Sequence, residues 1–229
     1  MSKSFDFYNE KFSRNGLRKN EQEKIRTSVF CIVGLGGTGG VVFENLVRIG
    51  AENFVLFEDD RIELSNFNRQ ILADERSLDM EKASSAVLRA KSINPKIRIV
   101  IKGKFGSKST LSGCNVVIDC TDNVQSKIIV SRAALKVKIP YVFCSSNDTR
   151  GIISVFEKYL FEKAFGIEKG SASKYKTCST ILCPSVMISG SIAASFAVNY
   201  LLKKNFVKAP EALFFDLSRE DVFWRAKLG

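Results

Sequence analysis

The stretch GLGGTGG has the residue types and spacing of a phosphate-binding turn. Its glycines, Gly34, Gly36, Gly37 and Gly39, would let the backbone approach a phosphate closely, and the helix that follows would present free N–H groups and a positive dipole end. Glu58 follows the next predicted strand, where an acidic side chain can accept hydrogen bonds from ribose hydroxyls. Taken alone, the pattern indicates a dinucleotide-binding oxidoreductase, or a turn that only packs a helix on a strand.

The residues downstream of the turn favour phosphate chemistry over hydride transfer. Arg69 lies in a polar loop with Asn66 and Gln70, Lys82 lies on the next helix, and Asp122 ends the fourth strand. The two cations can neutralise a triphosphate and the pentavalent transition state of its reaction, and a carboxylate such as Asp122 can hold Mg²⁺. A dehydrogenase needs none of these groups.

Alternating strands and helices must position these residues. The alternation predicts an α/β fold with a doubly wound, Rossmann-like and mostly parallel sheet, closed by a C-terminal antiparallel strand pair. A Lys- and Ser-rich stretch, residues 157–180, is predicted to be a mobile crossing loop, and residues 1–27 a polar helical segment. The expected strands are 28–33, 53–57, 97–101, 116–119, 140–145, 151–156, 213–217 and 222–227, and the expected helices are 41–49, 80–93, 127–136 and 186–202.

Composition narrows the possible partners. The chain has 35 Lys and Arg against 24 Asp and Glu, a net charge of +11, which suits an acidic protein or nucleotide phosphates. The basic residues are scattered and no nucleic-acid-binding motif is present, so nucleic acid is not an expected partner. No histidine occurs, which excludes His-based acid–base catalysis and His–metal ligation. No signal peptide or membrane span is apparent, and the expected location is cytoplasmic.

Five motifs together carry a family resemblance. They are GLGGTGG, D-x-I-E-x-S-N-x-N-R-Q, E-K-A, I-N-P and D-C-T-D-N. The chain resembles the ThiF/MoeB/HesA family of ubiquitin-activating-enzyme-like adenylyltransferases from about residue 12 to its end. The resemblance implies that the glycine turn binds ATP and that Asp122 binds Mg²⁺. It further implies that the remaining ATP contacts come from the residues Glu58 (ribose), Asp60, Asn66, Arg69, Gln70 and Lys82.

The resemblance also implies a homodimer. The sequence Phe12-Ser-Arg14 is similar to an N-terminal family element whose arginine reaches the ATP of the other subunit, although Asn15 replaces the usual glutamine. Residues 1–27 would then contact the partner, and residues 28–229 would form a single ATP-binding adenylation domain. Glu58 is a second departure, because the family usually has aspartate there.

The implied reaction is attack of a carboxylate on the α-phosphate of ATP, which gives an acyl-adenylate and pyrophosphate. A carboxylate is already ionised at neutral pH, so no general base is required, and this fits a chain without histidine. The expected substrate is the C-terminal Gly-Gly carboxylate of a ubiquitin-like or sulfur-carrier protein. Two alternatives stay open: a small-molecule or tRNA-linked carboxylate, and a non-catalytic carrier-binding subunit, against which the intact Arg69, Lys82 and Asp122 argue.

The six cysteines divide into two groups. Four lie in apolar strand-like runs and are predicted to be inert thiols: Cys31, Cys114, Cys120 and Cys144. Cys178 matches the place of a family cysteine that attacks the adenylate or the carrier, and its neighbours Lys174 and Lys176 would lower the pKa of its thiol. Cys183, expected to be more buried beside Pro184, is the competing candidate. The chain has no C-x-x-C pair and ends where the second family pair would begin, so no zinc is predicted.

Overall fold

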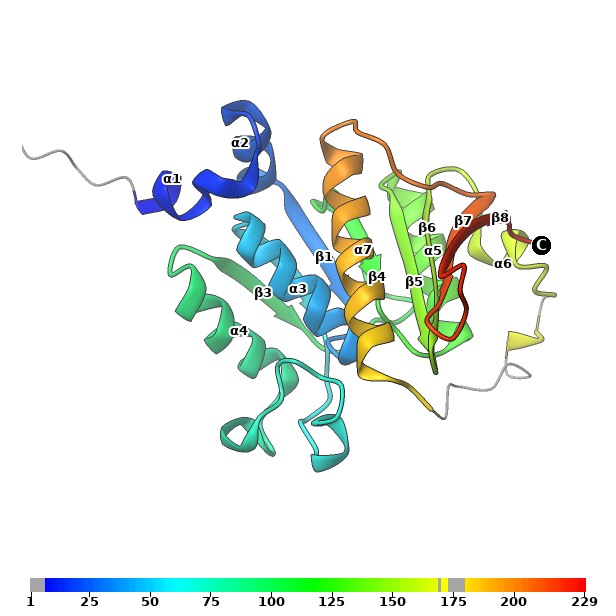
Figure 1. Ribbon diagram of the computed structural model, residues 1–229, viewed down its shortest axis with the longest axis horizontal. Coiled ribbons are helices and arrows are strands. Elements are labelled where there is room, and N and C mark those ends of the chain that lie inside the picture. Colours follow the sequence, from blue (N-terminus) through cyan, green and yellow to red (C-terminus); the bar gives the residue numbers. More distant parts are fainter. Residues whose placement is uncertain (1–6, 169, 173–179) are drawn as a thin grey trace, which may run out of the picture.

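A single mixed sheet forms the centre of the described molecule (Figure 1). The computed structural model describes residues 7–168, 170–172 and 180–229, and the strand order over these residues is β3-β2-β1-β4-β5-β6-β7-β8. The first five strands run parallel, as predicted. The strands are β1 (Val29–Val33), β2 (Asn53–Phe57), β3 (Arg98–Lys102), β4 (Val116–Asp119), β5 (Tyr141–Asn147), β6 (Arg150–Phe156), β7 (Glu211–Asp216) and β8 (Phe223–Lys227).

The antiparallel part of the sheet is larger than the expected C-terminal pair. The pairs β5–β6, β6–β7 and β7–β8 are all antiparallel. Only Asp148 and Thr149 separate β5 from β6. A parallel connection needs a crossover of a dozen residues or more, so this short link can only form a hairpin.

Helices cover both faces of the sheet (Figure 1). One apolar core lies between the sheet and α3, α4 and α7, and includes Phe43, Ala86 and Ala194. A second core lies on the opposite face and includes Val130 of α5 and Phe161 of α6. The helices are α1 (Phe7–Phe12), α2 (Lys19–Thr27), α3 (Gly37–Ile49), α4 (Lys82–Ile93), α5 (Val124–Val137), α6 (Phe161–Ala164) and α7 (Cys183–Leu201), with 3-10 turns at Ser13–Asn15, Leu64–Asn66 and Glu75–Ser77.

Several predicted boundaries differ from the structure: α5 and α7, for example, each begin three residues before the predicted start. Helix α3 begins at Gly37, four residues before the predicted start, and so takes in two of the turn's glycines. Part of the predicted crossing loop is helical, because α6 buries Phe161 and Ala164 against the second core. Among the described residues, no helix combines the length and apolarity needed to cross a lipid bilayer.

The N-terminal segment is fastened to the end of α3 that lies away from the glycine turn. The amides of Asn15 and Gln22 both donate to the carbonyl of Ile49, at 2.8 Å. Glu21 of α2 accepts from the backbone N–H of Arg18 and lies 3.0 Å from the Lys204 ammonium, just after α7. Asn15, which replaces glutamine in the family pattern, therefore ties this segment to the sheet domain.

Candidate nucleotide-binding site

A cleft of about 1130 Å³ lies at the carboxyl ends of the parallel strands. The strand order reverses between β1 and β4, and a crevice at such a switch point is the usual ligand site of an open α/β sheet. The predicted site residues that line this cleft come from four separate segments. These residues are Gly34, Gly36, Gly37, Glu58, Asp60, Asn66, Arg69, Gln70, Lys82 and Asp122.

Glycine occupies the four positions of the turn for different structural reasons. Gly34 has a φ of +87°, a conformation that favours glycine. A Cβ on Gly39 would lie 1.9 Å from the carbonyl oxygen of Gly34, and one on Gly37 would lie 2.8 Å from Val186 Cγ1. A Cβ on Gly36 would have nothing nearer than the Gln70 side-chain nitrogen, at 4.0 Å. Gly39 and Gly37 thus permit close packing, and Gly36 keeps the cleft open beside the start of α3.

Glu58 links the end of β2 to the glycine turn. Its Oε2 accepts a hydrogen bond from the backbone N–H of Leu35, at 2.6 Å. Its Oε1 accepts from the backbone N–H groups of Asp59 and Asp60, both at 2.9 Å. Each carboxylate oxygen has more than one lone pair, so Glu58 can still accept from a hydroxyl in the cleft.

Lys82 and Asp60 form one charged unit at the cleft wall. The Lys82 ammonium lies 2.9 Å from Asp60 Oδ2, and the Lys82 backbone N–H donates to the Asp60 carbonyl. The Lys82 side chain is buried and that of Asp60 is exposed. The carboxylates of Glu58, Asp59 and Asp60 lie within 4.8 Å of one another, but the amide and ammonium donors already occupy two of them, so we assign no cation there.

The polar loop holds its own side chains in place. Asn66 is buried and its Oδ1 accepts from the backbone N–H of Glu63, at 3.1 Å. Arg69 Nη1 donates to the Ser65 carbonyl at 2.7 Å and to Asn68 Oδ1 at 2.8 Å. A guanidinium has five N–H donors, so Arg69 keeps donors for an anion in the cleft. Gln70 is buried beside Gly36.

Hydrogen bonds to Asp119 fix the turn after β4, which presents Asp122 to the cleft. Asp119 is fully buried, and its Oδ1 accepts from the N–H and hydroxyl of Thr121, at 2.9 and 2.7 Å. Its Oδ2 accepts from the Tyr141 hydroxyl at 2.7 Å. Burial, together with the Asp119 charge, raises the pKa of Tyr141 well above its usual value, so the phenol stays a donor. Asp122 itself is exposed, with an Asn123 amide contact at 3.2 Å.

The sequence reasoning missed Lys127. Its side chain is almost fully buried in the first turn of α5, and its ammonium donates to the carbonyl of Cys144 at 3.2 Å. The ammonium also lies 3.8 Å from Asp119 Oδ1 and 5.1 Å from the ring centre of Phe143. The available signal was a lysine four residues after the helix N-cap Asn123, directly behind the D-C-T-D-N motif.

The thiols of the strands are positioned for packing. Cys31, Cys114 and Cys144 are buried, and Cys120 is partly exposed at the cleft. Cys120 Sγ lies 3.7 Å from Cys144 Sγ, and this hydrogen bond together with burial raises the pKa of the Cys120 thiol. A thiol held protonated is a poor nucleophile, which is consistent with an inert role for Cys120. Cys114 differs, because its hydrogen bond with Cys31 lowers the pKa of its thiol.

The two candidate reactive cysteines differ in what the structure shows. Cys183 is the first residue of α7 and is half-buried, next to an exposed Pro184. The expectation that Cys183 is more buried than Cys178 stays a prediction. The β5–β6 hairpin holds the chain just before Cys183, because the Leu182 N–H donates to the Asp148 carbonyl. Cys178, Lys174 and Lys176 lie outside the described residues. The predicted absence of zinc stays a prediction.

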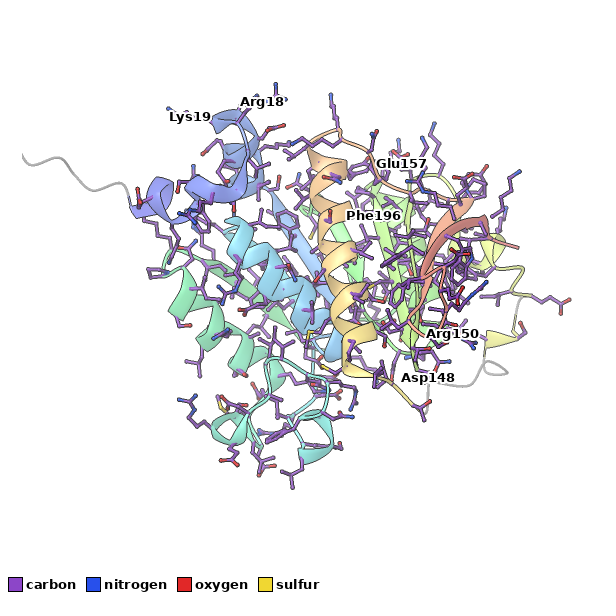
Figure 2. The ribbon with its side chains drawn as sticks, viewed as in Figure 1. Arg18, Lys19, Asp148, Arg150, Glu157 and Phe196 are labelled. Carbon is purple, nitrogen blue, oxygen red and sulfur yellow. The ribbon has the colours of Figure 1, made fainter. Side chains whose placement is uncertain are left out.

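Arg14 lies far from the cleft of its own subunit. It is exposed in the Ser13–Asn15 turn, beside the last residue of α3, whereas the cleft is at the first. The 13 residues of α3 separate these ends by roughly 20 Å at 1.5 Å per residue. In Figure 2, Arg18, which follows the Ser13–Asn15 turn, is labelled at the top of the molecule, and Asp148, next to the cleft residue Asn147, is labelled at the lower right. Arg14 cannot reach its own site from this position.

Comparison with known proteins identifies the family of this chain. The ThiF family profile matches residues 8–228. The molybdopterin-synthase adenylyltransferase of Haemophilus influenzae is 30% identical over 203 residues, which cover 86% of this chain and 84% of the relative. The sulfur carrier protein ThiS adenylyltransferase of Escherichia coli is 28% identical over 158 residues, covering 67% of this chain and 62% of the relative.

Solved structures show the same fold. Escherichia coli MccB, crystallised with succinimide, matches with a TM-score of 0.79 at 16% identity, over 97% of this chain and 73% of that one. PaaA matches with a TM-score of 0.74 at 18% identity, over 91% of this chain. The matched part is 66% of the PaaA chain, so this chain spans about two thirds of that protein.

Proposed function

This chain belongs to the ThiF family, and on that basis we propose that it is an adenylyltransferase which activates the C-terminal carboxylate of a ubiquitin-like or sulfur-carrier protein. The names of the matched relatives support this reaction class, because they are adenylyltransferases for molybdopterin synthase and for the sulfur carrier ThiS. The +11 charge suits an acidic carrier.

One observation carries the proposal: Gly36, Arg69, Lys82 and Asp122, from four separate segments, line a single cleft at the switch point. The open space at Gly36 and the free N–H groups at the start of α3 suit a phosphate. Arg69 and Lys82 supply positive charge beside them. This donor set fits a nucleoside triphosphate.

Asp122 fits a magnesium ion. Mg²⁺ is commonly held by one or two carboxylates together with substrate phosphates, and Asp122 is an exposed carboxylate at the edge of the cleft with no cation partner among the described residues. When bound, the ion would neutralise phosphate charge. The nearby Asp119 is not assigned as a ligand, because its side chain is fully buried and already paired with the Lys127 ammonium.

In the proposed reaction a carboxylate oxygen of the carrier attacks the α-phosphorus of ATP. The new P–O bond forms the acyl-adenylate while the bond to the β-phosphate breaks, and pyrophosphate leaves with the electron pair. The nucleophile is already ionised, so no proton moves in this step. Arg69, Lys82 and the N–H groups at the start of α3 stabilise the charge that develops on the phosphate oxygens.

We further propose that the protein is a cytoplasmic homodimer in which Arg14 completes the site of the partner subunit. The distance of Arg14 from its own cleft supports this arrangement. Residues 1–27 would contact the partner, and residues 28–229 would form the adenylation domain. A later thiol step would use Cys178 or Cys183, and Cys183 follows Ile181, which lines the cleft.

ATP–pyrophosphate exchange tests the proposal. Purified protein is incubated with ATP, Mg²⁺ and labelled pyrophosphate, and candidate carriers that end in Gly-Gly are added one at a time. We expect exchange that requires a carrier and disappears when its last two glycines are removed. Exchange that occurs with a small-molecule carboxylate and never with a carrier would contradict the proposed substrate.

A further inference from the structure

A buried ion pair lies beneath the turn that carries Asp122. Asp119 is 0% exposed and Lys127 is 4% exposed, and 3.8 Å separates the Lys127 ammonium from Asp119 Oδ1. Removing one partner of such a pair is strongly destabilising, because it leaves a buried charge without compensation. Asp119 begins the turn that carries Asp122, and Lys127 lies on the helix that follows this turn. The pair can therefore influence the conformation of the turn.

Asp119 determines the shape of the turn. Thr121 donates two hydrogen bonds to Oδ1, one from its backbone N–H and one from its hydroxyl, and Tyr141 donates to Oδ2. At the other end of the turn, Asn123 Oδ1 accepts from the N–H of Ser126 and caps α5. Asp122 is held between these two fixed points.

Lys127 is one of the residues that line the cleft, but protein groups engage its ammonium. Its ammonium is bound to the Cys144 carbonyl of β5 at 3.2 Å and lies over the Phe143 ring. Lys127 therefore links the turn after β4 to β5. Its positive charge also compensates the buried negative charge of Asp119. Its closest polar contacts are these protein groups, and not Asp122.

We propose that Lys127 is a positioning residue for the metal: by neutralising Asp119 it keeps the turn 119–123 in the shape that presents Asp122, and it does not itself contact the nucleotide. The inference rests on the metal role of Asp122 in the proposed function. If Lys127 served only to pack α5, its replacement would not change the affinity for the metal.

The test measures metal binding without turnover. Mn²⁺ replaces Mg²⁺ as a probe, and its affinity in the presence of a non-hydrolysable ATP analogue is measured by electron paramagnetic resonance. Lys127→Met should weaken Mn²⁺ binding at least about tenfold, or about 1.4 kcal/mol. The affinity for the analogue in the presence of EDTA should change less than about threefold, because Lys127 does not contact the nucleotide.

A charge-balanced double variant should reverse the effect. In Lys127→Met with Asp119→Asn, the asparagine oxygen can still accept both hydrogen bonds from Thr121, and its amide can donate to the Tyr141 hydroxyl. No uncompensated charge is then buried, and Mn²⁺ affinity should return to within about threefold of wild type. If Lys127→Met alone does not fold, the double variant still decides the question.

Arg132→Met is the matched control. Arg132 also lies on α5 and pairs with the mostly buried Glu162, at 2.7 Å, and neither residue is among the described residues that line the cleft. It should lower stability and leave Mn²⁺ affinity unchanged. A double variant that remains tenfold weaker, or a Lys127→Met protein that loses the analogue in EDTA, would overturn the positioning role. Wild-type protein that binds Mn²⁺ with the analogue but shows no exchange with any carrier would contradict only the proposed function.

Discussion

The glycines of the turn show how residues of one type can serve packing and binding separately. Gly39 has no space for a side chain because the Gly34 carbonyl lies where its Cβ would be, whereas Gly36 faces the cleft. The motif alone does not separate these roles, since it depends only on spacing. The structure distinguishes the two roles, because it shows which atoms a Cβ added at each glycine would contact.

The pair Gly36→Ala and Gly39→Ala tests this distinction. Gly39→Ala should destabilise the fold by about 3 kcal/mol, because the methyl group overlaps backbone that cannot move away. Gly36→Ala should lower the free energy of unfolding by no more than about 1 kcal/mol, which is the cost of alanine at a helix N-cap. The same variant should bind ATP at least about tenfold more weakly. Urea unfolding and calorimetric ATP titration measure the two quantities. Equal losses of stability in the two variants would contradict the assignment.

The thiols allow the two stages of the proposed chemistry to be separated. Adenylation uses no thiol, so Cys178→Ser and Cys183→Ser should both keep pyrophosphate exchange within about threefold of wild type. If the protein forms a thiol-sensitive conjugate with its carrier, Cys178→Ser should remove it and Cys183→Ser should not. Non-reducing gels with mass spectrometry identify the attachment site. A conjugate that survives Cys178→Ser and is lost in Cys183→Ser would reverse the assignment.

At the scale of elements, the sequence predicts the parts of the fold that have long, regular patterns. The parallel strands, α4, α5 and α7 all form within a few residues of their predicted ranges. The four-residue helix α6 is too short to show a helical period, so its formation depends on tertiary burial of Phe161. The early start of α3 likewise depends on Gly37 packing against Val186 of a distant helix.

In the candidate site, too, the features that depend on tertiary contacts could not be predicted from local sequence. Gly36, Arg69, Lys82 and Asp122 belong to motifs that are contiguous in the sequence, and all four line the same cleft. Lys127 was missed because its burial depends on the Cys144 carbonyl, which belongs to another strand. Such pairings follow from the three-dimensional arrangement and not from local sequence.

The stability of α2, which Glu21 caps at its N-terminus and joins to Lys204, should depend on pH. Hydrogen bonds from Arg18, followed by one from Lys204, lower the pKa of Glu21 to about 2 from its usual 4.5. Because the folded-state pKa is depressed, this stabilisation is fully present above about pH 4.5 and is lost as the pH falls through 2. Glu21→Gln should therefore melt below wild type at pH 7, with a gap that narrows below pH 4.5 and closes near pH 2. Thermal unfolding followed by circular dichroism checks this, and a gap that is constant with pH would contradict it.

At the scale of the whole molecule, the position of Arg14 predicts that two subunits share each active site. Neither Arg14→Ala nor Asp122→Ala protein should catalyse exchange alone. Mixing equal amounts should restore about a quarter of the wild-type rate, because half of the dimers are hybrids and each hybrid has one complete site. Fluorescence energy transfer between labelled subunits verifies that they exchange. No recovery after full exchange would show that Arg14 does not act in the partner's site.

If this cleft joins AMP to the terminal carboxylate of a protein, the mass of the carrier must change. After incubation with the enzyme, ATP and Mg²⁺, and rapid quenching in acid, the intact carrier should have gained the mass of one AMP at its last glycine, with one pyrophosphate released for each. A carrier without its final Gly-Gly should gain nothing, and Asp122→Ala enzyme should modify neither carrier. Pyrophosphate release without AMP on the carrier, or AMP on a carrier that lacks its terminal glycines, would contradict the account.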